Sequence, residues 1–243
     1  MVGVIIDTIA VLLGGLLGAW GGHHLSEDFK RNLNLIFGIC AMGMGIMAIA
    51  PMKNMPAVIF ALILGTAIGL ISHLGQLFDK GALLLQTPVT KFIHTEKLGL
   101  NEYDFVNQLV TAIVIFCTSG TGIYGALTAG MTGDNSILIS KAILDLFTAA
   151  IFACNLGYVV SLVALPQFIV LFALFILAQF IFPLTSGDMI TDFKACGGFL
   201  MLATGFRMAK IKIFPIADMI PAMVLVMPFT WLWTTFILPA LAS

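Results

Sequence analysis

Most of this sequence consists of apolar runs of about 20 residues, separated by short islands of charged residues. At a rise of about 1.5 Å per residue, an α-helix of that length crosses the ~30 Å hydrocarbon layer of a membrane. The composition agrees, because 60% of the residues are hydrophobic and 9% are charged, whereas soluble domains carry about 25% charged residues. The sequence therefore predicts an all-α, polytopic helical membrane protein.

Eight membrane spans are predicted within a single transmembrane domain, 1–243. Their expected ranges are 3–22, 33–51, 56–78, 105–130, 137–163, 166–183, 194–210 and 216–238. The polar stretch 79–104, between the third and fourth spans, is expected to be a cytoplasmic loop. If the short connection 164–166 is only a kink, seven spans are expected and the C-terminus changes side.

The basic residues are distributed unevenly over the predicted connections. Alternate connections contain Lys30, Arg31, Lys80, Lys91, Lys97, Arg207, Lys210 and Lys212, and the opposite ones contain Lys53 and Lys194. Since lysine and arginine accumulate on the cytoplasmic side of membrane proteins, eight spans place both termini outside the cytoplasm. The basic residues of 207–212 are expected to anchor at lipid headgroups, and Asp188, Asp192 and Lys194 are expected at a solvated helix start.

Three of the expected spans carry a small residue at every fourth position. The stripes consist of Ala10, Gly14, Gly18 and Gly22; of Ala57, Ala61, Gly65 and Gly69; and of Thr118, Gly122, Ala126 and Gly130. In lipid, small residues let two helix backbones approach closely. The stripes predict tight packing within the chain or a homo-oligomer, and a glycine-lined solute path is the alternative.

A faint internal repeat is also present. FKRNLNLIFG at 29–38 resembles FKACGGFLML at 193–202, and each segment is followed by a hairpin that contains two prolines. In the eight-span topology these hairpins face opposite sides of the membrane. The pair therefore suggests an inverted repeat, which is the plan of many secondary transporters.

The fourth predicted span is interrupted by an unusually polar segment, CTSGTGIYGALTAGMTGDNS at 117–136. Two glycines stand among three hydroxyl residues at 118–122, and each glycine weakens a helix by ~1 kcal/mol relative to alanine. A break at membrane depth would leave N–H and carbonyl groups for an ion or solute, provided that protein or a water-filled cavity surrounds them. The alternative is a continuous helix in which the hydroxyls bond to backbone carbonyls.

The second half of this segment is typical of a tight turn between helices. Gly133 is expected to end one helix, and Asp134 or Ser136 to cap the next. The next helix then places Lys141 and Asp145 four residues apart on one face. Each unpaired charge near the membrane centre costs about 2.5–3.5 kcal/mol, so the two are expected to pair within the helix or to form a charged wall of a site.

Asp7 in the first span belongs to the same class of charged residue, either inside the membrane or at its interface.

Several functions have no support in the sequence. The net charge of −1 gives no reason to expect nucleic-acid binding, and no cofactor, metal site or catalytic residue is expected. The motifs HExxH, GxSxG and the phosphate-binding loop do not occur, so the chain is not predicted to be an enzyme.

One long run carries a family resemblance. FCTSGTGIYGALTAGMTGDNSILISKAILDLFTAAIFACNLG resembles the central signature of bacterial inner-membrane proteins of the YqgA/YdfK type, known as domain of unknown function 554. AVLLGGLLGA and GGFLMLATGFRMAKIKIFPIADMIPAM extend the resemblance to nearly the whole chain. It implies a multi-pass bacterial inner-membrane protein and supplies no substrate. This family usually carries asparagine at the position of Asp7, so the resemblance does not imply a negative charge there.

The function predicted from these residues is transport of a small solute or ion, as a carrier or a channel, through a broken fourth helix. The candidate binding residues are Ser119, Gly120, Thr121, Gly122, Asp134, Asn135, Ser136, Lys141 and Asp145. The hydroxyls and backbone of 119–122 would contact the solute, 134–136 would form the outer mouth, and the charged pair would set the local field. The alternative is a non-transporting scaffold or partner subunit, assembled through the small-residue stripes.

Overall fold

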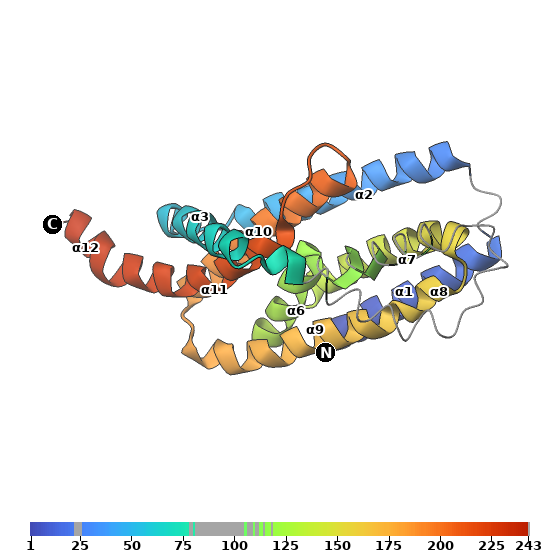
Figure 1. Cartoon of the computed structure of the whole chain (residues 1–243). Helices are drawn as coiled ribbons and strands as arrows, with labels where there is room; N and C mark the ends of the chain where they lie inside the picture. Colours follow the sequence, from blue (N-terminus) through green and yellow to red (C-terminus); the bar gives the residue numbers. More distant parts are fainter. Residues whose placement is uncertain are drawn as a thin grey trace.

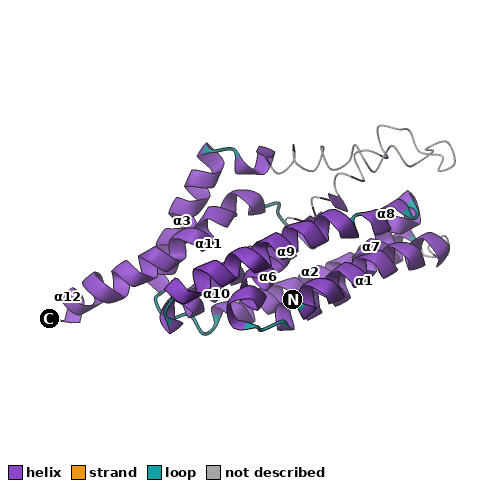
Figure 2. Ribbon diagram, turned by 90° about the horizontal axis from the view of Figure 1, so that it is seen from below, coloured by secondary structure: helices purple, strands orange, loops and turns teal. Residues whose placement is uncertain are grey.

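The structure, a computed structural model, describes residues 1–21, 26–77, 80, 105, 109, 112–113, 115–117 and 119–242. Every regular element that the described residues form is helical, which confirms the all-α prediction (Figures 1 and 2). The predicted loop 79–104 lies outside the described residues apart from Lys80. Gly22 and Thr118 of the small-residue stripes also lie outside them.

Each predicted span contains at least one described helix, but several helix ends differ from the prediction. The helices are α1 (Val2–Gly21), α2 (Glu27–Ile49), α3 (Met55–Ile71), α6 (Gly120–Thr132), α7 (Ser136–Leu156), α8 (Val159–Leu162), α9 (Ala164–Ile181), α10 (Gly187–Met208), α11 (Ile216–Leu232) and α12 (Leu238–Ala242). A short 3₁₀ turn, Phe182–Leu184, follows α9, and a π-helical turn, Trp233–Ile237, joins α11 to α12. Among the described residues, five helices are long and apolar enough to cross a membrane, and α3 is a shorter apolar helix of 17 residues.

The small-residue stripes pack helices together within the chain. α1 lies along α7 so closely that a Cβ atom at Gly14 would be 2.1 Å from the carbonyl oxygen of Leu146, and one at Gly18 would be 2.1 Å from that of Ala150. In the α3–α11 pair, a Cβ atom at Gly69 would lie 2.0 Å from the Asp218 carbonyl oxygen. The backbones of these helices are therefore in direct contact, as small residues in lipid allow.

The hairpins α2–α3 and α10–α11 pair with each other helix by helix (Figure 1). α2 crosses α10 in the antiparallel direction, because Gly38 faces Gly205 while Gly45 faces Gly198. α3 and α11 are also antiparallel. This is the arrangement that an inverted repeat requires, and it joins the two segments whose sequences resemble each other.

The connection between α7 and α9 is a full reversal of the chain. Gly157, with φ of 70°, ends α7 at Leu156, so the span predicted to reach 163 is shorter than expected. Ala150 of α7 lies beside Gly18, near the end of α1. Further along the chain, the Ser161 hydroxyl donates at 3.1 Å to the carbonyl oxygen of Leu12, which is nearer the start of α1. Since the chain has turned back toward the start of α1, the fifth and sixth predicted spans are separate helices and the connection is not a kink.

Burial is arranged as expected for a protein surrounded by lipid. Large apolar side chains on the outside are well exposed, for example Ile63 at 64% and Val224 at 67%. Several charged and polar side chains are instead completely buried, among them Asp7, Gln167 and Asp192 at 0% exposure. Polar groups inside a membrane protein normally mark a functional region or a tightly bonded structural one.

Candidate functional site

The fourth predicted span is interrupted at Ser119. Residues 115–117 are helical, Ser119 has an extended backbone with φ of −69° and ψ of 137°, and α6 begins at Gly120. The Ser119 hydroxyl accepts a hydrogen bond from the Gly122 N–H at 3.1 Å, and the Thr204 hydroxyl accepts one from the Gly120 N–H at 3.1 Å. Two N–H groups released by the break are thus bonded to hydroxyls, as helix capping requires.

Two glycines of this segment serve close packing at the start of α6. A Cβ atom at Gly120 would lie 2.5 Å from the Leu200 carbonyl oxygen of α10, and one at Gly122 would lie 2.9 Å from Cε of Lys141. The first turn of α6 therefore presses against the α10 backbone on one side and the Lys141 side chain on the other. The break thus brings the hydroxyls of Ser119 and Thr121 next to the charged residues of α7.

Four side chains form a buried ion cluster beside this break: Asp7 of α1, Lys141 and Asp145 of α7, and Gln167 of α9. The Lys141 ammonium group donates to Oδ2 of Asp7 at 2.9 Å and to Oδ2 of Asp145, one turn further along its own helix. The Gln167 amide donates to the same two oxygens, at 2.8 Å and 2.9 Å. Measured over the whole residue, none of the four is more than 9% exposed.

The cluster does not balance its charges or its hydrogen bonds. Two carboxylates face a single ammonium group, so one negative charge is left over if both acids are ionised. Oδ1 of Asp7 and Oε1 of Gln167 are also buried without a hydrogen-bond partner among the described residues. Leaving a charge or a polar atom unsatisfied in such an environment is unfavourable, and buried groups of this kind are characteristic of functional sites.

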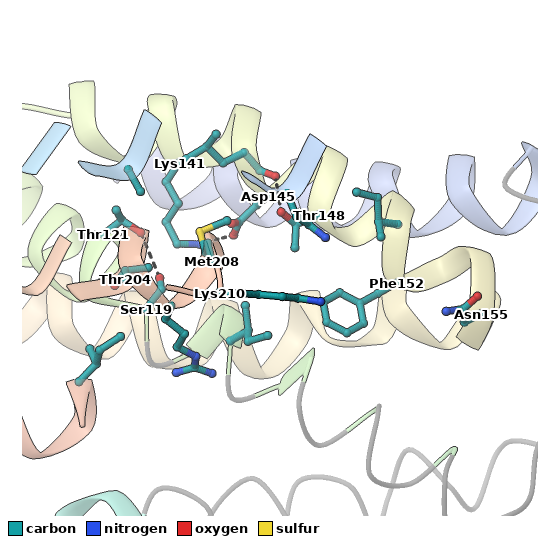
Figure 3. A pocket seen from close by; sticks show the side chains of 17 residues that line it. Ser119, Thr121, Lys141, Asp145, Thr148, Phe152, Asn155, Thr204, Met208 and Lys210 are labelled. Carbon is teal, nitrogen blue, oxygen red and sulfur yellow. Dashed lines mark hydrogen bonds and ion pairs between the residues drawn. The ribbon is translucent and has the colours of Figure 1, made fainter. Parts of the chain in front are cut away.

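A cavity of about 360 Å³ opens beside the cluster (Figure 3). Its polar lining residues are Asn34, Ser119, Thr121, Lys141, Asp145, Thr148, Asn155, Thr204, Arg207 and Lys210. Asp7 and Gln167 do not line it, and they lie behind Lys141 and Asp145. The Asp145 side chain is accordingly 13% exposed and that of Asp7 is 0% exposed. The volume is within the range of small-molecule sites, at about 300–1,000 Å³.

The C-terminal end of α10 forms the far wall of this cavity. Lys210 has a left-handed backbone with φ of 55°, and its N–H donates to the Arg207 carbonyl oxygen at 3.1 Å. Glycine is the usual residue in this conformation at a helix end. In Figure 3 the Lys210 side chain extends across the cavity toward Phe152. Arg207 and Lys210 were expected to anchor at lipid headgroups, and the structure places both in the cavity wall instead.

The outer turn of the predicted site lies apart from this cavity. Gly133, with φ of 76°, ends α6 as predicted. Oδ1 of Asp134 accepts from the N–H and the hydroxyl of Ser136 at 2.9 Å and 2.6 Å, and the Asn135 side chain accepts from the Gly3 N–H at 2.9 Å. The Ser136 hydrogen bonds lower the pKa of Asp134. Asp134 and Ser136 line a second cavity, of about 570 Å³, together with Tyr124 and Lys194.

Four of the nine predicted site residues therefore line one cavity: Ser119, Thr121, Lys141 and Asp145. The sequence analysis missed Gln167, which follows a proline at the start of the sixth predicted span. The available signal was a polar residue in the apolar stretch ALPQFIVL.

Asp192 was wrongly expected at a solvated helix start. It is buried and accepts hydrogen bonds from the Lys53 and Asn54 N–H groups and from the Thr230 hydroxyl. These bonds tie α10 to the start of α3 and to α11, so the residue has a structural role.

The comparison with protein families agrees with the resemblance found in the sequence. The family described as "Protein of unknown function (DUF554)" matches residues 2–231. The chain belongs to this family. "Uncharacterized protein YqgA" of Escherichia coli (strain K12) is 44% identical to it over 240 residues, covering 97% of this chain and 99% of the relative. "Uncharacterized membrane protein YdfK" of Bacillus subtilis (strain 168) is 25% identical over 229 residues, covering 93% of each. No solved structure matches the chain.

Proposed function

We propose that this DUF554 protein transports a small anionic solute, as a carrier or channel, through the cavity beside the interrupted helix. One observation carries the proposal. The hydroxyls at the break, Lys141 and Asp145 of the ion cluster, and two basic residues at the end of α10 line a single cavity within the helical bundle. Asp145 lies nine residues beyond Ser136, the first residue of α7, which corresponds to ~14 Å along the helix. A helix that crosses the membrane from Ser136 would therefore carry Asp145 near the middle of the hydrocarbon layer.

The charges of the cavity favour an anion. Asp7 and Asp145 compensate the charge of Lys141, whereas Lys210 at the end of α10 adds a positive charge to the wall. The N-terminus of α6 also points its backbone dipole toward this region, and helix N-termini attract anions. A small carboxylate or an inorganic anion would fit a volume of about 360 Å³.

The two cavities support a path across a bacterial inner membrane. Arg207 and Lys210 belong to a connection that the basic-residue bias assigns to the cytoplasm, so the first cavity would open inward. The second cavity contains Asp134 and Ser136 from the opposite connection and would open outward. Thr121 lines the first cavity and Tyr124 lines the second, so about one turn of α6 separates them. A rocking movement of the inverted repeat would expose each cavity in turn.

Flux in liposomes tests the proposal. Purified protein would be reconstituted, and uptake of radiolabelled chloride, acetate, lactate and succinate would be measured for wild type and for Ser119→Ala and Lys210→Gly. We expect both variants to lose at least ~90% of the uptake of the transported anion, since a lost charge-assisted contact weakens binding by about 1.5–3 kcal/mol. Lys210→Gly should remain folded because glycine is favoured at its left-handed backbone.

The matched control is Lys212→Met, which removes an exposed lysine outside the cavity lining and should keep wild-type flux. If wild-type protein moves none of the four anions, the proposed solute class is wrong. If it moves one of them and both cavity variants match wild type, the proposed site is wrong.

The scaffold alternative stays a prediction. Its argument was that the glycine stripes assemble several copies of the chain, but Gly14, Gly18 and Gly69 are occupied by backbone contacts within the chain. Homo-oligomerisation therefore stays a prediction without a surface assigned to it. Chemical cross-linking of the protein in native membranes would test it directly.

A further inference from the structure

We propose that the buried ion cluster binds one proton, taken from the cavity through Asp145 and shared between the carboxyl groups of Asp145 and Asp7. The starting observation is the charge balance. Asp7, Lys141 and Asp145 provide two carboxyl groups and one ammonium group, joined through common hydrogen bonds. One proton makes the cluster neutral, and without it the cluster keeps a buried negative charge that hydrocarbon and protein stabilise poorly.

The unpartnered oxygen atoms indicate that the cluster has more hydrogen-bond acceptors than donors. Oδ1 of Asp7 and Oε1 of Gln167 are buried acceptors, and neither has a hydrogen-bond donor among the described residues. Both Oδ2 atoms of the acids already accept from Lys141 and Gln167. Protonation of a carboxyl group turns one of its acceptor oxygens into a donor. One bound proton would therefore supply a donor to a cluster that has more acceptors than donors.

The proton has a defined way in. Asp145 lines the cavity and Asp7 lies behind it, so a hydronium ion in the cavity reaches Asp145 first. An O–H bond breaks in the hydronium ion and leaves water, and a new O–H bond forms on the carboxylate. Exchange with Asp7 follows, because the Oδ2 atoms of both acids share the same two donors. Two interacting acids of this kind titrate as one coupled unit.

Other charged groups around the cluster do not replace the proton. Among the described residues, the ion pairs of Asp7 and Asp145 are with Lys141. The Lys210 side chain lies in the same cavity and extends toward Phe152. The Cys117 thiol lies near Lys141 and Asp145, but a thiol carries no positive charge in either protonation state and so cannot balance a carboxylate. A metal cation would stand next to the Lys141 ammonium group and be repelled by it. The described residues contain no group of three or more histidine, cysteine, aspartate or glutamate side chains that could hold a metal ion.

The bound proton would couple to transport, and this part of the inference rests on the proposed function. An anion in the cavity is repelled by a negatively charged cluster and not by a neutral one. Anion binding therefore favours proton binding and, by thermodynamic reciprocity, proton binding favours the anion. The expected reaction is symport of one proton with the anion.

Infrared spectroscopy tests proton binding without any transport. The protein would be purified in a maltoside detergent, which has no carbonyl group, and the carboxylic acid C=O band would be recorded at pH 7 in H₂O and D₂O. We expect a band equivalent to one protonated carboxyl in wild type, lost in Asp7→Asn because Lys141 and Asp145 then balance each other. The matched control is Asp188→Asn, an exposed carboxylate, which should keep the band.

Two results would overturn proton binding. One is a folded wild-type protein without a carboxylic acid band at pH 7, and the other is a band that persists unchanged in Asp7→Asn. If Asp7→Asn does not fold, thermal unfolding of the wild-type protein is compared in NaCl and in choline chloride. Specific stabilisation by Na⁺, with no acid band in wild type, would assign the site to a metal cation instead.

Coupling is tested separately in liposomes with the anion that wild type transports. An inward proton gradient should raise wild-type uptake by about 5-fold or more, and Asp7→Asn should show uptake that does not respond to the gradient. If flux occurs in wild type without any response to the gradient, the coupling fails while the transport proposal stands. If the infrared band is present but no anion moves, proton binding stands and the transport proposal fails.

Discussion

At the scale of single residues, the structure shows how a membrane protein can hold several charges in its interior. Lys141 alone would be expensive to bury, but it lies between Asp7 and Asp145. Gln167 of α9 donates to the same two carboxylates. The stability of each charged group in this cluster therefore depends on the other members.

Replacing Lys141 by methionine should destabilise the protein strongly. The variant leaves two carboxyl groups without their positive partner, and breaking one member of a buried ion pair typically costs ~3–5 kcal/mol. Thermal unfolding in detergent would measure the effect. Adding Asp7→Asn and Asp145→Asn to the variant should recover much of the loss, since no buried charge then remains. A single variant as stable as Lys212→Met would contradict the proposed role of the ammonium group.

A second residue-scale prediction concerns Asp134 in the turn before α7. Its pKa is lowered by the Ser136 hydrogen bonds. The ionised form therefore stabilises the fold at pH values above the unfolded-state pKa of 3.8. This stabilisation is lost as the pH falls through the lower pKa of the folded state. Because Asp134 is exposed, solvent screens this contribution, so Asp134→Asn should lose at most about 0.5 kcal/mol at pH 7 and should come closer to wild type at pH 3. Chemical unfolding at both pH values would check this, and an equal difference at both would refute it.

At the scale of helices, close backbone contact determines which residues meet. α1 and α7 run in parallel because Gly14 and Gly18 leave room for the carbonyl oxygens of α7. That register places Asp7 beside Lys141. The glycines thus determine the geometry of a charged site that lies two or more turns away from them.

Gly14→Ala should separate α1 from α7. The added methyl group would lie 2.1 Å from a backbone carbonyl oxygen, and overpacking of this kind costs ~1–3 kcal/mol. Thermal unfolding should show the loss, and the carboxylic acid band of the ion cluster should change with it. Gly21→Ala is the matched control, because no atom lies within 4 Å of a Cβ atom there. Equal stability of the two variants would show that the α1–α7 contact is adaptable.

At the scale of the whole molecule, the chain places two cavities on either side of one turn of α6. The first contains Lys210 and the second contains Ser136. The pairing of α2–α3 with α10–α11 provides the two units that the proposed carrier would move against each other. A carrier needs both features, since its site must open to the two sides in turn.

The orientation of the two cavities can be tested in bacterial cells. In a variant without the four native cysteines, a cysteine at position 136 should react with a membrane-impermeant maleimide applied to intact cells. A cysteine at position 210 should react only in inverted membrane vesicles, because its connection belongs to the basic side. The reverse labelling pattern would show that the assigned orientation is wrong and that the cavity of Lys210 faces outward.

The sequence by itself determined the features that depend on local pattern. Span length and hydropathy identified the membrane helices, Gly133 marked a helix end, and the four-residue spacing of Lys141 and Asp145 predicted their ion pair. The hydroxyl and glycine residues at 118–122 also indicated a break, which the structure places at Ser119. Each of these properties depends on neighbours within one or two helical turns.

Only the tertiary structure decided which distant residues meet. Asp7 and Gln167 join Lys141 from two other helices, and Asp192 is buried against the start of α3. Hydropathy does not predict such contacts, because in lipid an apolar helix face gains little by turning toward another helix. The register between helices is determined by backbone packing at small residues and by buried polar bonds, and both appear only when the helices are assembled.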